Sequence, residues 1–174
     1  MIELERTFLA KYIPKDLAGC KSKEIFDVYI PKAKEHPTIR MRKNGDKFEM
    51  TKKEPVHGTD SSHQEEQTII LTEEEFKEIS KIGGKELRKI RYCYPYKDKF
   101  AEIDIFQDLL SGLVVMDFEF ETMEEKESFI APDFCLIEVT QEKFLAGGML
   151  AGKSFSEIEN YLKELGYSKL FLKK

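Results

Sequence analysis

The sequence predicts an α+β fold that is mainly β: an eight-stranded antiparallel β-barrel with a charged interior and helices packed outside. Three observations lead to this prediction. Eight segments alternate apolar and polar residues with the two-residue period of a strand. Short turns join most of these segments, as in antiparallel hairpins. Two further segments have helical periodicity, and each carries an apolar stripe that needs a surface to cover.

The strand-like segments are bounded by turn residues and are rich in β-branched, aromatic and charged side chains. In chain order they are 2–10, 24–31, 38–43, 47–54, 63–71, 87–96, 99–107 and 113–122. Asn44-Gly45-Asp46, between the third and fourth segments, is a strong hairpin signal. The polar stretch 55–62 is predicted to be a loop.

The first helix is predicted from a capping box at its start. Thr72 and Glu75 have the spacing in which each side chain satisfies the other residue's backbone amide. Phe76, Ile79 and Ile82 then follow at helical spacing, and a Gly-Gly pair stops the helix.

Two more helices are predicted nearer the C-terminus. Residues 156–165 carry apolar side chains at helical spacing before Gly166, and residues 124–130 form a shorter helix that Pro132 ends. Gly147-Gly148 is glycine-rich but lacks the spacing of a phosphate-binding loop, so it is interpreted as a turn.

Length and composition favour one soluble domain over residues 1–174, long enough to bury a core. Charged residues make up 35% of the chain, with 33 acidic against 28 basic side chains and a net charge of -5. An acidic balance argues against nucleic acid as the main partner.

The three cysteines lie far apart and have no CxxC spacing, which favours free thiols in a reducing compartment. The sequence has no apolar run near the ~20 residues of a membrane helix and no secretory pattern at its start. We therefore expect a cytoplasmic protein with no membrane partner.

Paired charges recur on one face of several predicted strands. For a single pair, a solvated outer face is the more common explanation. Here pairs of both signs recur, and the helices could cover an apolar outer face of the sheet. The charged faces would then line a tunnel in which unlike charges offset one another and anions can bind. The pattern alone leaves both arrangements open.

Acidic side chains dominate the first, seventh and eighth segments. Carboxylates gathered on one concave face repel each other unless cations lie among them. A site without clustered His or Cys suits a hard ion such as Mg²⁺ or Mn²⁺. The candidates are Glu3, Glu5, Glu66, Glu102, Asp104, Asp117 and Glu119.

Basic side chains occupy the third, fourth and sixth segments. Arginine binds phosphate through two parallel hydrogen bonds, and lysine acts as a point charge. A basic wall that faces a metal-binding acidic wall would hold a polyphosphate chain. The candidates are Arg40, Arg42, Lys53, Lys89 and Arg91.

Taken in order, these motifs resemble those of the CYTH or triphosphate tunnel metalloenzyme family. Glu3-Leu4-Glu5-Arg6 is similar to its N-terminal ExExK signature, and Ile39–Arg42 with Thr51–Lys53 to its paired-Arg and T-x-K strands. The remaining correspondences are Lys89–Tyr92 with K-x-R-Y, Glu102–Asp104 with E-x-D, Asp117–Glu119 with E-x-E, and Glu138–Thr140 with E-V-T, followed by Lys143.

The resemblance implies an eight-stranded tunnel that hydrolyses a small triphosphate with Mg²⁺ or Mn²⁺. The substrate would be inorganic triphosphate or an organic one such as thiamine triphosphate or a nucleotide. By this resemblance Glu3, Glu5 and Glu119 are catalytic, and the metal-linked carboxylates are these three with Glu102, Asp104 and Asp117. Substrate binding falls to Arg40, Arg42, Lys53, Glu66, Lys89, Arg91 and Lys143.

One residue departs from the family pattern. The signature has a lysine where this chain has Thr7, on the same face as Glu3 and Glu5. This departure keeps a triphosphate-binding module with little catalysis as an alternative, and adenylate cyclase, which uses the same tunnel, is another. The apolar stretch Leu109–Met116 and the C-terminal helix would serve either a homodimer interface or the core.

Overall fold

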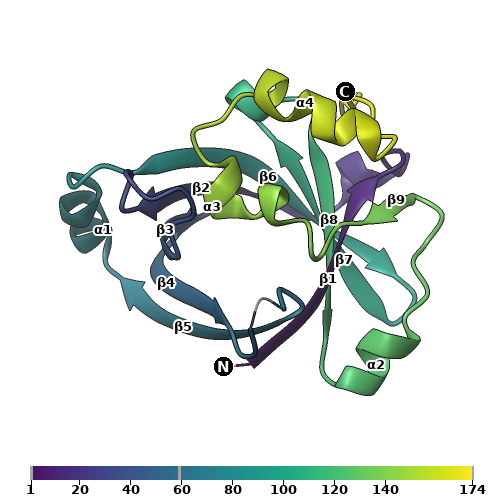
Figure 1. Cartoon of the computed structure of the whole chain (residues 1–174), viewed down its shortest axis with the longest axis horizontal. Coiled ribbons are helices and arrows are strands. Elements are labelled where there is room, and N and C mark those ends of the chain that lie inside the picture. Colours follow the sequence, from purple (N-terminus) through teal and green to yellow (C-terminus); the bar gives the residue numbers. More distant parts are fainter. Residues whose placement is uncertain (1, 59, 174) are drawn as a thin grey trace.

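The protein is described by a computed structural model that covers residues 2–58 and 60–173. Eight antiparallel strands form a closed barrel (Figure 1). Each coincides with a predicted segment to within about two residues. They are β1 (Ile2–Ala10), β2 (Ser22–Ile30), β3 (Ile39–Asn44), β4 (Lys47–Pro55), β5 (His63–Leu71), β6 (Lys85–Tyr96), β7 (Lys99–Phe106) and β8 (Val114–Phe120).

The barrel runs in the order β5-β4-β3-β2-β6-β7-β8-β1, and a β1–β5 pairing closes it. The predicted hairpin between β3 and β4 is present, with Gly45 at φ 61°. The closing seam is short, because β1 pairs with β5 only through Ile2–Leu4 against His63–Glu65. Beyond this seam β1 continues alongside β8.

A ninth strand, β9 (Cys135–Glu138), was not predicted. It pairs with the C-terminal half of β1, on the edge that β5 leaves free. The strand is short and lies outside the closed barrel. Its four residues alternate too briefly to show a strand period in the sequence.

Helix α1 (Glu73–Ser80) covers the outer, apolar face of the barrel, as predicted. Its capping box is present: the Thr72 hydroxyl accepts from the Glu75 amide, and the Glu75 carboxylate accepts from the Thr72 amide. Phe76 packs with Val28 and Met41 of β2 and β3. The prediction for Ile82 was wrong, because the helix ends at Ser80 and Ile82 is 73% exposed.

The outer face of β1, β7 and β8 is covered by aromatic packing. Phe8 and Phe118 meet edge to face at 5.8 Å, and Phe129, just after α2 (Met123–Ser128), packs on Phe118. The three tyrosines of β6 pack against the same cluster. The charged face of these strands is therefore turned inward.

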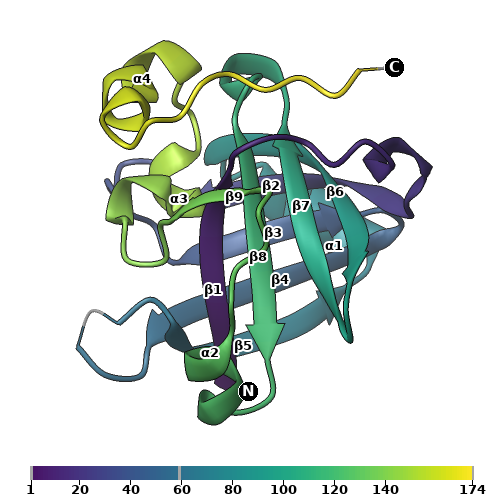
Figure 2. The ribbon, with the colours of Figure 1, turned by 90° about the vertical axis from the view of Figure 1, so that its right-hand side faces the viewer.

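The C-terminal third closes one end of the barrel. This part of the chain contains η3 (Lys143–Leu145), α3 (Gly147–Leu150) and α4 (Phe155–Glu164). Earlier in the chain there are two short 3-10 helices, η1 (Leu17–Gly19) and η2 (Asp108–Leu110). Leu150, Ile158 and Leu162 share one core with Leu87 and Phe106, whose side chains face the barrel interior. Figure 2 shows α4 and the C-terminal segment passing over this end. These helices cover an end of the barrel, whereas the sequence placed all helices on its outer face.

No helix within residues 2–58 and 60–173 is long and apolar enough to cross a membrane.

Candidate active site

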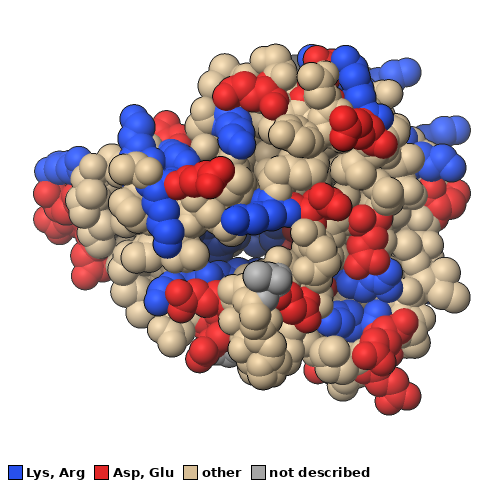
Figure 3. Space-filling view, viewed as in Figure 1, with Lys and Arg blue, Asp and Glu red and all other residues tan. Residues whose placement is uncertain are grey.

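The barrel interior holds a cavity of about 390 Å³, within the range of small-molecule sites. Side chains from all eight barrel strands line it, together with η3 and the start of α3. Figure 3 shows its mouth as a hollow bordered by basic and acidic side chains. The closed end is apolar, with Leu87, Phe106 and Val115 in the wall.

Every residue proposed from the sequence for the site lines this cavity. The set is Glu3, Glu5, Arg40, Arg42, Lys53, Glu66, Lys89, Arg91, Glu102, Asp104, Asp117, Glu119 and Lys143. Strand alternation brings them together, because each strand turns the same parity of residues inward. The open choice between an outer and an inner charged face is thereby resolved in favour of the inner face, and the roles of the individual residues stay predictions.

An acidic wall is formed by β1, β7 and β8. Glu5 lies directly opposite Glu119 in the β1–β8 pairing, and Glu102 lies opposite Asp117 in the β7–β8 pairing. Burial raises the pKa of Glu5 to about 7; Lys53 opposes this shift, and the charges of Asp117 and Glu3 add to it. Burial also raises the pKa of Glu119, with Glu102 and Glu3 contributing.

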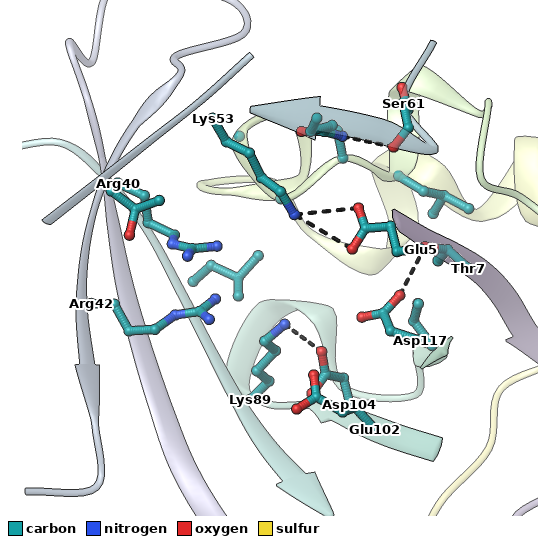
Figure 4. A pocket seen from close by; sticks show the side chains of 18 of the residues that line it. Glu5, Thr7, Arg40, Arg42, Lys53, Ser61, Lys89, Glu102, Asp104 and Asp117 are labelled. Atoms are coloured by element: carbon teal, nitrogen blue, oxygen red, sulfur yellow. Dashed lines mark hydrogen bonds and ion pairs between the residues drawn. The ribbon is translucent and has the colours of Figure 1, made fainter. Parts of the chain in front are cut away.

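Lys53 reaches from β4 across to the acidic wall (Figure 4). Its ammonium group forms an ion pair with Glu3 and lies 3.3 Å from Glu5 Oε1 and 3.4 Å from Glu5 Oε2. Burial would lower the pKa of Lys53, but the two carboxylates outweigh burial and raise it. Lys53 is therefore a tethered cation between two of the proposed metal ligands.

Arg91 and Lys89 of β6 both bind Asp104 of β7. Arg91 donates from Nε and Nη2 to the two Asp104 oxygens at 2.7 Å each, pairs with Glu102 through Nη1, and lies 3.4 Å from Asp117. Lys89 forms an ion pair with the same carboxylate. Burial would raise the pKa of Asp104, but these two cations hold it well below its usual range.

The two arginines of β3 differ in their partners. Arg42 donates from Nε to Asp27 Oδ1 at 2.7 Å and from Nη2 to Asp27 Oδ2 at 2.8 Å, in a buried pair. Among the described residues, no carboxylate lies within ion-pair distance of Arg40, and its buried Nε has no hydrogen-bond partner. Its guanidinium points into the cavity (Figure 4).

Sequence reasoning missed several lining residues, among them Tyr29 and Lys23 of β2 and His36. It also missed Asp27 of β2, which is fully buried and binds the lining residue Arg42. The period of β2 could have identified the three residues of this strand, since they share the parity of the inward positions. Asp27 was passed over because a lone carboxylate between Phe26 and Val28 does not form a charge pair within its strand. Thr51 also faces inward and shares a 2.8 Å hydrogen bond with Thr68.

Thr7 occupies the position of the signature lysine. Its hydroxyl donates to Asp117 Oδ1 at 2.8 Å (Figure 4). Its backbone amide donates to the Thr140 hydroxyl at 3.0 Å. Arg6 leaves on the outer face, where it binds Glu138 and the carbonyl of Phe129. The first strand therefore brings two carboxylates but no cation into the cavity.

The donor chemistry of the acidic wall fits a hard divalent cation. Within the described part of the chain, no three acidic, histidine or cysteine side chains converge as metal ligands. The wall nevertheless offers oxygen donors alone, and the raised pKa of Glu5 reflects burial and repulsion between carboxylates that a cation would relieve. Glu3, Glu5, Asp117 and Glu119 are the side chains that would hold such an ion.

Comparison with known proteins gives one related sequence and several related folds. The inorganic triphosphatase of Nitrosomonas europaea is 28% identical over 144 residues, which cover 82% of this chain and 92% of that protein. The crystal structure of the inorganic triphosphatase NE1496 has a TM-score of 0.62 at 24% identity and covers 87% and 95% of the two chains. No model of a known protein family matches the chain.

A proposed adenylate cyclase from Bacillus halodurans shares the fold alone, with a TM-score of 0.53 at 16% identity over 99% of this chain and 94% of that one. These similarities in sequence and in fold confirm the resemblance to the CYTH family that the motifs predict.

Proposed function

We propose that this protein is a metal-dependent triphosphatase that hydrolyses a small triphosphate in its barrel, with Mg²⁺ or Mn²⁺ as the ion. One observation carries the proposal: an acidic wall and a basic wall face each other across a cavity of about 390 Å³. The similarity to an inorganic triphosphatase supports the same reaction. Free cysteines at all three positions agree with a cytoplasmic protein.

The basic wall binds the phosphates in this proposal. Arg40 has no carboxylate partner among the described side chains, so its donors are available to an anion. Lys143 lies exposed at the rim, on η3, and can extend the binding surface toward solvent. Arg42, Lys89 and Arg91 are held by carboxylates and provide donors in fixed positions beside Arg40.

In this proposal the acidic wall binds the metal and accepts the proton that the attacking water releases. When bound, the ion would polarise the phosphoryl group under attack. In hydrolysis a water oxygen bonds to the terminal phosphorus, the anhydride P–O bond breaks, and the water gives up a proton. A carboxylate of this wall, Glu3, Glu5 or Glu119, would accept that proton as the general base.

A phosphate-release assay tests the activity directly. The purified protein is given tripolyphosphate, thiamine triphosphate or ATP in Mg²⁺ and in Mn²⁺, and we expect phosphate from at least one of them. A folded protein that turns over no triphosphate with either ion would contradict the enzyme assignment. Tight calorimetric binding without product would instead support a binding module, the alternative that Thr7 keeps open.

Product analysis separates the hydrolase from the cyclase. Hydrolysis of ATP releases phosphate, whereas cyclisation releases pyrophosphate and cyclic AMP. The two reactions share the phosphate and metal contacts and differ in how the nucleophile is placed. We expect phosphate without cyclic AMP.

Two substitutions separate binding from turnover. Arg40→Ala should raise KM for the triphosphate about tenfold or more, because it removes an available guanidinium. Glu119→Ala should mainly lower kcat, by about a hundredfold, because it removes a carboxylate of the metal-linked wall. Steady-state kinetics with Arg88→Ala and Glu121→Ala, a half-buried and an exposed residue outside the cavity, provide matched controls. Wild-type kinetics in both cavity variants would mean that these walls play no part.

A further inference from the structure

Five charged side chains from β2, β3, β6 and β7 form a layer in one wall of the cavity, and of the five only Asp27 does not line it. The layer contains three cations and two carboxylates. Arg42 pairs with Asp27, and both Lys89 and Arg91 pair with Asp104. Asp27 and Asp104 are at most 1% exposed, and Lys89 and Arg42 are under 10% exposed. Glu102 also pairs with Arg91, so carboxylates and cations are equal in number in the whole network.

Asp27 accepts from two of the five N–H donors of Arg42. It accepts from Nε and Nη2 in a bidentate pair, the strongest geometry for a carboxylate and an arginine. Of the described hydrogen bonds, none comes from Arg42 Nη1. Arg40, two residues before it on β3 and facing the same cavity, has a buried Nε without a partner.

The pairing also holds the Arg42 side chain in place along its length. Asp27 lies directly opposite Arg42 in the β2–β3 ladder, so their bond spans the shortest cross-strand distance. Arg40 lies opposite the uncharged side chain of Tyr29 in the same ladder. Two arginines on one strand face thus have one charged and one neutral backing residue.

We propose that Asp27 is a positioning residue that restrains Arg42, so that Arg40 makes the main arginine contact with the phosphates. This inference rests on the proposed function. Asp27 accepts from Nε and Nη2 of Arg42, so these two donors cannot bind the anion. The same bonds prevent the Arg42 guanidinium from moving with the substrate. Binding strength is reduced in exchange for a fixed arrangement of charge around the reacting phosphate.

The substitution Asp27→Asn separates this role from a purely structural one. It removes the negative charge while keeping the shape of the side chain, so Arg42 gains freedom to bind an anion and the layer gains a positive charge. We expect the Kd for tripolyphosphate, measured by calorimetry with EDTA, to fall about threefold to tenfold. We expect kcat to fall by a similar factor, because Arg42 would then stabilise the bound substrate more than the transition state.

A thermal measurement gives a second readout. Asp27→Asn should lower the Tm of the free protein, because it leaves Arg42 buried without its counter-ion. Tripolyphosphate should then raise the Tm of the variant by more than it raises that of the wild type. A residue with a merely structural role would lower the Tm and weaken binding together.

Asp108→Asn is the matched control. Asp108 makes the same bidentate pair with Arg88 on the outside of the barrel, at 2.6 and 2.8 Å, and asparagine tolerates its positive φ of 53°. This control should leave Kd and kcat unchanged. The double variant Asp27→Asn/Arg42→Gln should lose the gain in affinity, because that gain acts through Arg42.

The outcomes divide clearly. Binding by Asp27→Asn that equals or is weaker than wild-type binding overturns the proposal, as does a gain in affinity that survives Arg42→Gln. If Asp27→Asn does not fold, Asp27→Glu keeps the charge but displaces the guanidinium: lower kcat without weaker binding supports the proposal, and weaker binding overturns it. Failure of the proposed function is a different result: the wild-type protein would bind tripolyphosphate but would not hydrolyse it with either metal.

Discussion

Glu5 shows at the scale of a residue how the cavity sets its own chemistry. Its carboxylate is buried beside Asp117 and Glu3, and only Lys53 offsets these effects, so its pKa rises to about 7. A carboxyl whose pKa is higher in the folded than in the unfolded state keeps its proton longer when folded. As the pH rises through the interval between the two values, the unfolded state ionises first and folding stability falls.

The pH dependence of stability should therefore change in Glu5→Gln. In the metal-free wild type, Glu5 lowers the free energy of unfolding by up to about 3 kcal/mol as the pH rises from about 4.5 to about 7. Glu5→Gln removes this contribution. Urea unfolding in EDTA at pH 5 and pH 7.5 should show the variant gaining relative to the wild type at the higher pH. Glu74→Gln, on the exposed side of α1, should keep the wild-type difference, and equal differences in all three proteins would contradict the prediction.

Residues such as Glu5 were predictable from sequence because a strand repeats every two residues. Glu3 with Glu5, Arg40 with Arg42 and Asp117 with Glu119 each form a pair at that spacing. Asp27 was not predictable in this way, since its partner Arg42 lies on the neighbouring strand. Cross-strand partners depend on register, and register is fixed only once the barrel closes.

At the scale of an element, α3 shows why two adjacent glycines do more than turn the chain. Residues Gly147–Leu150 form a short helix, whereas the sequence predicted a turn. A Cβ on Gly147 would lie 2.0 Å from the Tyr29 hydroxyl, and one on Gly148 would lie 2.6 Å from the Pro37 carbonyl. The glycines therefore let the helix approach the end of the barrel closely. Such an approach depends on segments more than a hundred residues away, so local pattern could not reveal it.

Gly147→Ala should disturb this end of the cavity. The added methyl group forces Tyr29 or α3 to move, and overpacking of this kind costs about 1–3 kcal/mol of stability. Since Tyr29 lies opposite Arg40 and both line the cavity, binding of tripolyphosphate should weaken as well. Urea unfolding and calorimetry measure both effects. Gly19→Ala is the control, because a Cβ there meets nothing within 4 Å; two variants of equal stability would show that the close approach is unimportant.

At the scale of the whole molecule, the barrel has one weak line of closure. β6 and β7 pair along Lys89–Tyr96 against Lys99–Phe106, whereas β1 and β5 meet only through Ile2–Leu4. The pairing of consecutive strands from β2 to β5 and from β6 to β8 followed from hairpin connections in the sequence. The β2–β6 and β8–β1 pairings and the length of this seam did not. The length of the seam depends on where β1 stops pairing with β5 and begins to pair with β9. Tertiary contacts determine this position, and no local sequence pattern marks it.

Lys53 supplements this short seam with charge. From β4 its side chain reaches past β5 to Glu3 and Glu5 on β1, so two ion pairs cross the closure that few backbone hydrogen bonds hold. A part-buried pair of this kind loses more when one partner is removed than an exposed pair does. The site and the closure of the barrel therefore share a residue in the metal-free protein.

Lys53→Met should make the seam open more often. The substitution keeps an apolar chain but leaves Glu3 and Glu5 without their cation, so amide hydrogens of His63–Glu65 should exchange about tenfold faster in EDTA, as expected when local opening becomes about 1.4 kcal/mol easier. Amides shared by β6 and β7 should keep their wild-type rates. Lys52→Met, the adjacent residue whose exposed side chain pairs with Glu54, is the matched control. Amide hydrogen exchange measured by mass spectrometry tests this prediction. Uniformly faster exchange across all strands would contradict it, because Lys53 would then stabilise the whole fold and not the seam alone.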